Sequence, residues 1–249
     1  MSAPYRPVTL DDSEQLLAMS YRLRYQSFCL ERLFFSKDEY PSQLESDTFD
    51  RASVHLGVLN AQDELVGTAR VVTPTSAGLP LFRYCTLFPH ETTLADPSNT
   101  VVELSRVCVN RRWNRQSVDK VNAPAEERAP VSLPPPASEP GRESNDAFAA
   151  LIKGMYQVTK RLHGTHWIIA VEKGLRRRLS RYGLPFSLAG PEVDYHGPVA
   201  PYVLSLAELD DVILTGKYPV IEDFPLASSP STGQRLWSTR VPSPEASFS

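Results

Sequence analysis

The chain has 249 residues, of which 41% are hydrophobic and 22% charged, so it can bury a sizeable core and falls within the range of one large domain. Its net charge of −3 is spread over mixed signs and gives no bulk electrostatic reason to expect a nucleic-acid partner. No stretch approaches the roughly 20 apolar residues of a membrane helix, and the first residues lack the basic and apolar regions of a signal peptide. We therefore expect a cytoplasmic protein with no transmembrane segment and no nucleic-acid partner.

Cysteine and histidine give no pattern typical of a disulfide framework or a metal site. Cys29, Cys85 and Cys108 stand at wide spacings without a CxxC pair, so we expect them to be small core residues. His163 and His166 are three apart, but no cysteine or acidic third ligand lies near them in the sequence. We expect no metal ion in this protein.

The first half of the chain contains one helix signal and three strand signals. Residues 11–13, Asp-Asp-Ser, offer N-cap oxygens before a run rich in helix formers, EQLLAMSYRLRYQSFCLERLFF. Two β-rich runs, SVHLGVL and LVGTARVVT, are separated by the turn-like residues 60–64 and predict an antiparallel hairpin. A third run, VVELSRVCV at residues 101–109, predicts a strand at the centre of the sheet.

The middle and the end of the chain differ in composition from the rest. Residues 117–145 contain six prolines among Ser, Ala and charged residues without apolar periodicity, which predicts a disordered insertion. The Ser/Pro-rich residues 225–249 predict a flexible tail. We therefore expect one domain over residues 1–224, interrupted by the insertion.

The core is expected to resume after the insertion. The pattern predicts a helix over residues 146–162, a buried strand over 167–171, a basic helix ending at Gly183, and a strand around 202–206. The Arg176–Arg178 run on the basic helix is typical of a solvated face, and a binding surface is the alternative.

Six charged residues stand out: one on the expected first helix, two that are three residues apart in ESDTFD, and three within expected core strands. They are Arg24, Asp47, Asp50, Arg70, Glu103 and Arg106. Burying an unpaired charge costs several kcal/mol, and these three arginines balance these three acids, so the set is expected to form one neutralised cluster. For Arg24 the alternative is a snorkelling side chain whose head stays in water. The charge pattern alone does not distinguish a structural ion network from an active site.

The order of four motifs, YRLRYQSFCLER, ESDTFDR, VGTARVV and VELSRVCVNRR, resembles the acyl-homoserine-lactone (autoinducer) synthases and the related long-chain N-acyl amino acid synthases. It looks closest to the acyltransferases associated with the PEP-CTERM/exosortase system. The resemblance covers residues 20–115, and more weakly the region after the insertion. The residues that match family positions are Arg24, Phe28, Asp47, Asp50, Arg70, Glu103 and Arg106.

The resemblance implies an α/β (α+β) acetyltransferase-like (GNAT) fold, with a mixed, largely antiparallel central sheet flanked by helices. It also implies an N-acyltransferase whose active site is an electrostatic cluster. The donor would be a fatty acyl thioester, carried on the phosphopantetheine of an acyl carrier protein or on coenzyme A. The acceptor would be the amine of an amino acid or similar small molecule, and no cofactor would be tightly bound.

Two departures from the family narrow this expectation. The acyl-homoserine-lactone synthases carry a Trp where this chain has Phe34 and Phe35, and they lack the proline-rich insertion. Both differences argue against homoserine-lactone formation by this chain. Coenzyme-A-dependent acetyltransferases follow the central strand with a Gly-rich loop that holds the pyrophosphate, and residues 111–116 contain no glycine. We therefore favour a carrier protein as donor, with Arg111 and Arg112 contacting its acidic surface.

Glu103 is the candidate general base, because the ammonium form of an amine must lose a proton before it attacks a thioester. In a regular strand Glu103 and Arg106 point to opposite faces, so placing both in one site needs a β-bulge. A bulge would also free a backbone N–H for the developing oxyanion. Asp47 and Asp50 would receive the acceptor's ammonium, while the arginines hold its carboxylate or fix the acidic loop.

An acyl tunnel is expected between the helices and the sheet, lined partly by the aromatic residues that follow Arg24. The expected substrate-binding residues are Phe28, Phe34, Phe35, Ser105, Val107, Arg111 and Arg112. Two other functions stay open on the sequence. One is a coenzyme-A-dependent N-acetyltransferase acting on a small amine, and the other is a catalytically silent acyl-binding or regulatory module.

Overall fold

The structure is a computed structural model that describes residues 5–91, 93, 95–110 and 140–215. Arg111 and Arg112 lie outside the described residues, as do the predicted tail and most of the predicted insertion. The helix expected from residue 146 begins earlier, at Pro140, so the last residues of the predicted insertion belong to it.

Four α-helices are described, and the first ends earlier than its sequence suggests. They are α1 (Glu14–Tyr25), α2 (Pro140–Arg161), α3 (Lys173–Arg181) and α4 (Leu206–Leu214). Ser13 caps α1 as expected, since its hydroxyl accepts the Leu16 N–H at 3.3 Å. After Tyr25 the chain continues as a π-helical segment, η1 (Gln26–Glu31), and turns at Leu33, whose φ is 56°. Three short 3₁₀ segments follow at Lys37–Glu39 (η2), Thr48–Ala52 (η3) and Pro80–Arg83 (η4).

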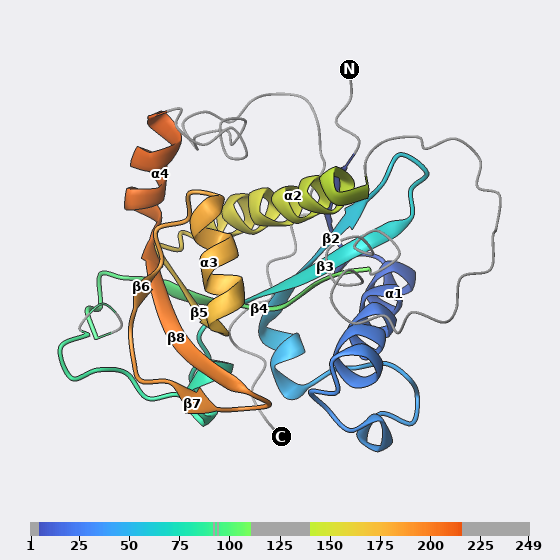
Figure 1. Cartoon of the computed structure of the whole chain (residues 1–249), viewed down its shortest axis with the longest axis horizontal. Helices are drawn as coiled ribbons and strands as arrows, with labels where there is room; N and C mark the ends of the chain where they lie inside the picture. Colours follow the sequence, from blue (N-terminus) through green and yellow to red (C-terminus); the bar gives the residue numbers. More distant parts are fainter. Residues whose placement is uncertain (1–4, 92, 94, 111–139, 216–249) are drawn as a thin grey trace, which may run out of the picture.

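The strands form one eight-stranded mixed sheet in the order β1-β2-β3-β4-β5-β8-β6, with β7 paired to β8 (Figure 1). The strands are β1 (Arg6–Thr9), β2 (Ser53–Leu59), β3 (Leu65–Val72), β4 (Val101–Val109), β5 (His166–Val171), β6 (Ser187–Leu188), β7 (Val193–Asp194) and β8 (Pro198–Ser205). Every pair is antiparallel except β4 with β5. The predicted hairpin is β2–β3, and β4 lies inside the sheet as expected.

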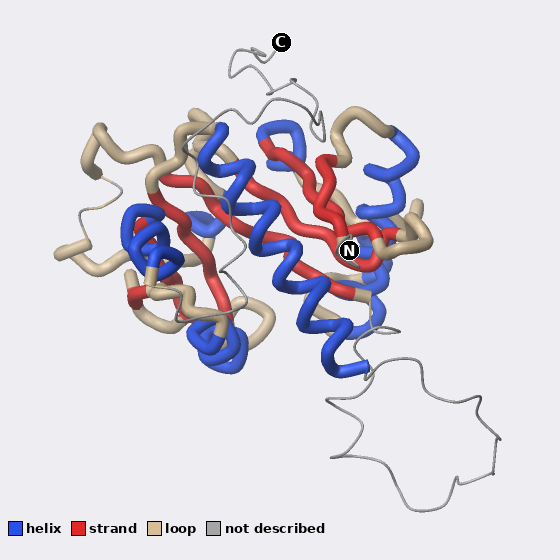
Figure 2. The backbone as a smooth tube through the Cα atoms, turned by 90° about the horizontal axis from the view of Figure 1, so that it is seen from above, coloured by secondary structure: helices blue, strands red, loops and turns tan. Residues whose placement is uncertain are grey.

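The two faces of the β2–β4 region have opposite chemistry. On one face, Val54, Val71 and Leu104 belong to the main apolar core, which includes the buried residues of α2. On the other face, His55, Arg70 and Ser105 occupy one row across the three strands, because His55 pairs with Arg70 and Arg70 with Ser105. α1 packs against β3 and β4 on this polar face, so α1 and α2 lie on opposite sides of the sheet (Figure 2). The alternation of strand side chains thus separates the core from the charged residues.

β4 is irregular at the point where its charges fall. Thr68 pairs with Cys108 and Arg70 with Ser105, so Ala69 faces two residues of β4, Arg106 and Val107. This is the β-bulge that the sequence predicted, and Arg106 adopts a positive φ of 53° within it. The bulge turns Arg106 to the same face as Ser105 and Glu103.

β4 and β5 diverge soon after they meet. Their parallel pairing is limited to Val101–Glu103 with His166–Ile168. Beyond Glu103 the remaining residues of β4 have no partner on β5. Side chains from both faces of the sheet line the space between the two strands. All three cysteines are buried without a disulfide, as expected.

Candidate active site

Arg24 lies at the end of α1 with only 1% of its side chain exposed, which excludes the snorkelling alternative. Its Nε donates to Glu45 Oε2 at 2.6 Å, and its Nη1 donates to Asp50 Oδ1 at 2.8 Å. The Glu45 side chain is fully buried. The guanidinium therefore stands between two carboxylates on the polar face of the sheet.

Asp47 and Asp50 are fixed by a capping box at the start of η3. Asp47 Oδ1 accepts the Phe49 N–H at 2.8 Å, and Asp50 Oδ2 accepts the Asp47 N–H at 2.7 Å. Arg70 Nη1 donates to both carboxylates, at 2.6 Å to Asp47 and 2.8 Å to Asp50. The spacing of three residues between the two acids thus comes from local helix capping, and Arg70 joins them to β3.

Arg106 completes the network from the bulge of β4. Its Nε donates to Glu45 Oε1 at 3.1 Å, and its Nη2 donates to Asp47 Oδ2 at 3.0 Å. The three arginines and three acids therefore alternate in a closed circuit, in the order Arg24, Glu45, Arg106, Asp47, Arg70, Asp50 and back to Arg24. We call this circuit the ion-pair cycle; its formal charges sum to zero.

The membership of the cycle corrects one expectation. Glu45, rather than Glu103, is its third acid, and Glu45 was missed because it lies in a polar segment that resembles an exposed loop. Glu103 forms no ion pair with any residue that the structure describes. Its Oε2 accepts the Leu81 N–H at 2.8 Å, and the residue is 2% exposed. Burial raises the pKa of Glu103 to about 7, against the opposing effects of the Leu81 N–H and of Arg70 and Arg106.

Asp47 and Asp50 are held ionised. Burial would raise the pKa of Asp50, but its hydrogen bond with His55 and the charges of Arg24 and Arg70 outweigh burial and hold the pKa well below its usual range. The pKa of Asp47 is lowered for similar reasons, with Arg70 as the main opposing partner to burial. Each of the four carboxylate oxygens already accepts at least one hydrogen bond. These two acids are therefore poorly placed to receive an ammonium group.

A cavity of about 210 Å³ opens where β4 and β5 diverge. Five of the expected substrate-binding residues line it: Phe28, Phe34, Phe35, Ser105 and Val107. Glu103 and Arg106 line it as well, whereas Arg24, Asp47, Asp50 and Arg70 do not. The opposite wall is apolar and comes from α2, β5, α3 and the chain after α3: Phe148, Ile152, Met155, Trp167, Ile169, Leu175, Leu179, Leu184 and Phe186.

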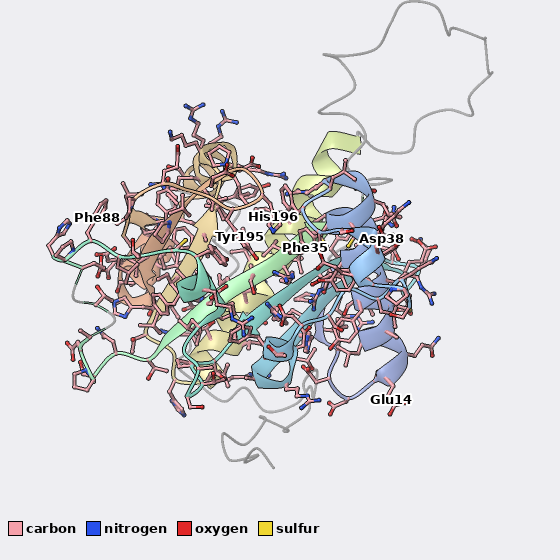
Figure 3. The ribbon with its side chains drawn as sticks, turned by 90° about the horizontal axis from the view of Figure 1, so that it is seen from below. Glu14, Phe35, Asp38, Phe88, Tyr195 and His196 are labelled. Carbon is pink, nitrogen blue, oxygen red and sulfur yellow. The ribbon has the colours of Figure 1, made fainter. Side chains whose placement is uncertain are left out.

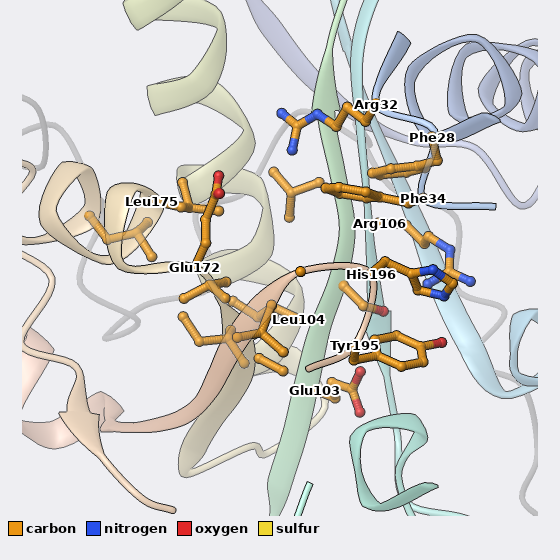
Figure 4. A pocket seen from close by; sticks show the side chains of 18 of the residues that line it. Phe28, Arg32, Phe34, Glu103, Leu104, Arg106, Glu172, Leu175, Tyr195 and His196 are labelled. Atoms are coloured by element: carbon orange, nitrogen blue, oxygen red, sulfur yellow. The ribbon is translucent and has the colours of Figure 1, made fainter. Parts of the chain in front are cut away.

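The cavity is polar around Glu103 and Arg106, and its remaining lining is largely apolar apart from Arg32 and Glu172. Figure 4 shows Glu103 near Tyr195 and Arg106 near His196, with Phe34 away from them and Leu175 on the far wall. Only 18% of the Arg106 side chain is exposed. An elongated molecule could thus place a polar group near Glu103 and an apolar chain along the opposite wall.

The π-helical segment places aromatic residues against Arg106. Phe28 lies in η1, and its carbonyl accepts N–H groups from both Phe34 (2.7 Å) and Phe35 (3.3 Å), so the chain folds back on itself. The Arg106 guanidinium carbon lies 4.7 Å from the centre of the Phe35 ring and 5.9 Å from that of Phe28. These contacts orient the exposed side of Arg106 toward the cavity.

The turn between β7 and β8 covers the cavity near Glu103, which the sequence did not reveal. Tyr195 stacks on Tyr84 with ring centres 3.7 Å apart and planes 2° apart. The His196 and Phe35 rings pack in a T-shaped arrangement with their centroids 5.2 Å apart, and Figure 3 shows Tyr195, His196 and Phe35 gathered together. His196 has a φ of 55° within this turn. No local pattern could signal these contacts, since they join distant parts of the chain.

The described part of the chain holds no group of three or more His, Cys, Asp or Glu side chains arranged to bind a metal ion. None of its helices is long and apolar enough to cross a membrane. The Arg176–Arg178 run is only partly solvated, since Arg176 lies over Tyr202 and Arg178 over Phe148.

A family model for the acetyltransferase (GNAT) domain matches residues 23–122 of the chain. This segment contains the whole ion-pair cycle, the bulge of β4 and Glu103. A search of curated proteins finds no match in sequence.

Several solved structures are similar to this one in fold. A CoA-dependent acyl-homoserine lactone synthase, BjaI, with SAM and isopentyl-CoA, aligns over 88% of this chain and 91% of its own, at 18% identity and a TM-score of 0.57. TofI, in a ternary complex with an inhibitor and MTA, aligns over 82% and 96%, at 18% identity and a TM-score of 0.55. FeeM, an N-acyl amino acid synthase from uncultured soil microbes, aligns over 87% and 99%, at 15% identity and a TM-score of 0.53. The chain has the acetyltransferase-like fold.

Proposed function

We propose that the protein is an N-acyltransferase that moves a fatty acyl group from a thioester donor to the amine of an amino acid or similar small molecule. The observation that carries this proposal is the placement of Glu103, a buried carboxyl group with a pKa of about 7, in the polar part of a cavity with a long apolar wall. A group with such a pKa both loses and accepts a proton near neutral pH, as a general base must. The fold and the motif order support the same reaction class.

In the proposed reaction Glu103 takes a proton from the acceptor's ammonium group. The free amine nitrogen then attacks the thioester carbonyl carbon, a C–N bond forms, and the C–S bond breaks to release the thiol after protonation. The bulge at Arg106 interrupts the β3–β4 ladder, and β4 has no β5 partner there, so a backbone N–H near the bulge is available to stabilise the oxyanion.

Arg106 is the residue that we assign to the acceptor's carboxylate. Of the three arginines in the cycle it has the most exposed side chain, at 18% against 1% for Arg24 and Arg70. Glu103 and Arg106 are three residues apart on a bulged strand, which separates their Cα atoms by about 7–10 Å. Two side chains at this spacing can hold the ammonium and the carboxylate of one amino acid. Arg24 and Arg70, with Asp47 and Asp50, would then fix Arg106 rather than touch the substrate.

The donor is proposed to be an acyl carrier protein. The support is the glycine-free, arginine-rich sequence after β4, including Arg111 and Arg112, which suits an acidic carrier better than a nucleotide pyrophosphate. The link to the PEP-CTERM/exosortase system rests on the motif resemblance and is part of the same proposal. So are the cytoplasmic setting and the single domain over residues 1–224.

The test is a product assay with both donor types. Purified protein is incubated with a panel of amino acids and a fatty acyl group on carrier protein or on coenzyme A, and products are identified by mass spectrometry. N-acyl amino acid formed faster from the carrier would support the full proposal. Turnover with acetyl-CoA alone would instead indicate a small-molecule acetyltransferase, and no turnover with any donor would indicate a non-catalytic acyl-binding module.

A further inference from the structure

His55 adjoins the ion-pair cycle from β2, two strands away from β4, and only 3% of its side chain is exposed. Its Nδ1 lies 2.6 Å from Asp11 Oδ1, and its Nε2 lies 3.1 Å from Asp50 Oδ1. The backbone N–H of His55 also donates to Asp11 Oδ2 at 3.0 Å. Each ring nitrogen therefore faces a carboxylate oxygen in a buried environment.

These contacts fit the imidazolium form of His55. An ionised carboxylate only accepts hydrogen bonds, and neutral imidazole donates from one ring nitrogen only, so the neutral form would leave one nitrogen lone pair against an oxygen. Asp50 stays ionised because Arg24 and Arg70 also bind it. Burial alone would lower the pKa of His55, but the bonds with Asp11 and Asp50 outweigh burial and raise it.

A continuous chain of contacts links His55 to the cavity. Asp50 Oδ1, which meets His55, also accepts from Arg70 Nη1 at 2.8 Å. Arg70 Nε donates to the Ser105 hydroxyl at 3.1 Å, and Ser105 directly precedes Arg106 and lines the cavity. Arg70 also shares Asp47 with Arg106. A change at His55 thus reaches Arg106 by two routes.

We propose that His55 is a positioning residue that, as imidazolium, ties Asp11 to Asp50 and thereby holds Arg106 toward the acceptor. This inference rests on the proposed function, because it gives Arg106 a substrate to bind. His55 does not touch the cavity, so it acts only through the ion-pair cycle. None of the four sequence motifs that resemble those of acyltransferases includes His55.

The groups that face His55 determine how it responds to pH. They are Asp11 before α1, Tyr21 and Arg24 on α1, Asp50 on η3 and Arg70 on β3. Burial and Asp50 raise the pKa of Tyr21 to about 12, so it stays neutral. His55 with Asp11 leaves the formal charge of the enlarged cluster at zero. When pH rises through the raised pKa of His55, the cluster gains one negative charge and loses one hydrogen bond.

Asp11→Asn in the full-length protein is the first test, because it leaves every residue of the cycle and cavity in place. Without the Asp11 charge the imidazolium is less favoured, so the alkaline limb of kcat/KM for the amino acid acceptor should move to lower pH than in the wild type. His55→Gln should lower this kcat/KM about tenfold at pH 6 and leave it near wild type above the alkaline limb, with the KM for the acyl donor unchanged. A merely structural role would give the same ratio at every pH. His166→Gln, at a strand histidine outside the cycle, should leave the limb unmoved.

A nitrogen-15 NMR titration tests the same link without any turnover. Both ring nitrogens of His55 should be protonated at neutral pH, and the Arg106 Nε signal should shift at the same pH as His55 loses its proton. The proposal would be overturned if Asp11→Asn left the alkaline limb of kcat/KM at its wild-type pH. It would also be overturned if the Arg106 Nε signal did not change when His55 loses its proton. If His55→Gln fails to fold, Asp11→Asn carries the kinetic test. A coupled titration in a protein without any acyl transfer would uphold the tie between His55 and Arg106 and refute the proposed function instead.

Discussion

Glu103→Gln should lower activity and raise stability at the same pH. Gln keeps the shape and the bond with the Leu81 N–H but cannot accept a proton, so kcat should fall by roughly 10²–10⁴, the usual contribution of a general base. Donor binding should change little, because the acyl chain contacts the apolar wall.

The stability effect follows from the pKa of Glu103. A carboxyl group whose pKa is raised in the folded protein binds its proton more tightly there than in the unfolded chain, so folding stability falls as pH rises from the ordinary value to the raised one. Since one pKa unit corresponds to about 1.4 kcal/mol, moving the pKa from 4.5 to about 7 costs up to about 3 kcal/mol above pH 7. Glu103→Gln removes this cost at pH 8 and leaves stability nearly unchanged at pH 4.5, where Glu103 is protonated.

The assay combines steady-state kinetics with urea unfolding at both pH values. In the wild type, kcat should show an acid limb near pH 7 that Glu103→Gln lacks. Glu208→Gln, at an exposed position on α4, is the matched control and should change neither property. A folded Glu103→Gln protein with near-normal kcat would refute the assignment of Glu103 as the base. An equal loss of stability at both pH values would refute the argument from burial.

Three further changes test the cycle and the cavity. Glu45→Gln should destabilise the fold by about 3–5 kcal/mol in urea unfolding, because it leaves the buried Arg24 and the neighbouring Arg106 with one acid too few, whereas Asp63→Asn, at an exposed ion pair, should cost at most about 1 kcal/mol. Arg106→Lys should raise the KM for the amino acid acceptor at least about tenfold and leave the KM for the donor within about twofold, because a single ammonium cannot span Glu45 and the acceptor carboxylate as a planar guanidinium does. Leu175→Trp should shorten the longest acyl chain accepted, measured as the ratio of kcat/KM for long and short donors, since Leu175 lines the apolar wall.

Strands β2 to β4 and the bulge were accessible from the sequence because each leaves a local mark, whereas the short strands β1, β6 and β7 were not predicted. Alternation of apolar residues marks β2 to β4, and a base candidate and an arginine three residues apart on one strand share a site only across a bulge. The end of α1 was not accessible. Its helix formers continue well past Tyr25, and the change to a π-helical turn depends on Phe34 and Phe35 folding back onto the Phe28 carbonyl.

Counting charges predicted a neutral cluster and five of its six members, but it named the wrong third acid. A sequence shows that three arginines need three acids, and Glu103 was the natural third because it interrupts an apolar strand. Glu45 has no such signal, since it lies in a largely polar segment and pairs with arginines from two distant elements, Arg24 on α1 and Arg106 on β4. The stacking of Tyr84 on Tyr195 was likewise inaccessible, because it depends on the path of two loops from distant parts of the chain.

The exclusion of Glu103 from the cycle suits it to the base role that we propose. A carboxylate paired with two arginines is held ionised with a low pKa, as Asp50 shows, and such a group would be a poor proton acceptor near neutral pH. Because Glu45, Asp47 and Asp50 already neutralise the three arginines, Glu103 meets only the residual attraction of Arg70 and Arg106, and burial sets its pKa. An acid added to the cycle would make Glu103 harder to ionise, and an acid removed would make it easier. The cycle therefore contributes to the electrostatic environment of Glu103, although Glu103 is not one of its members.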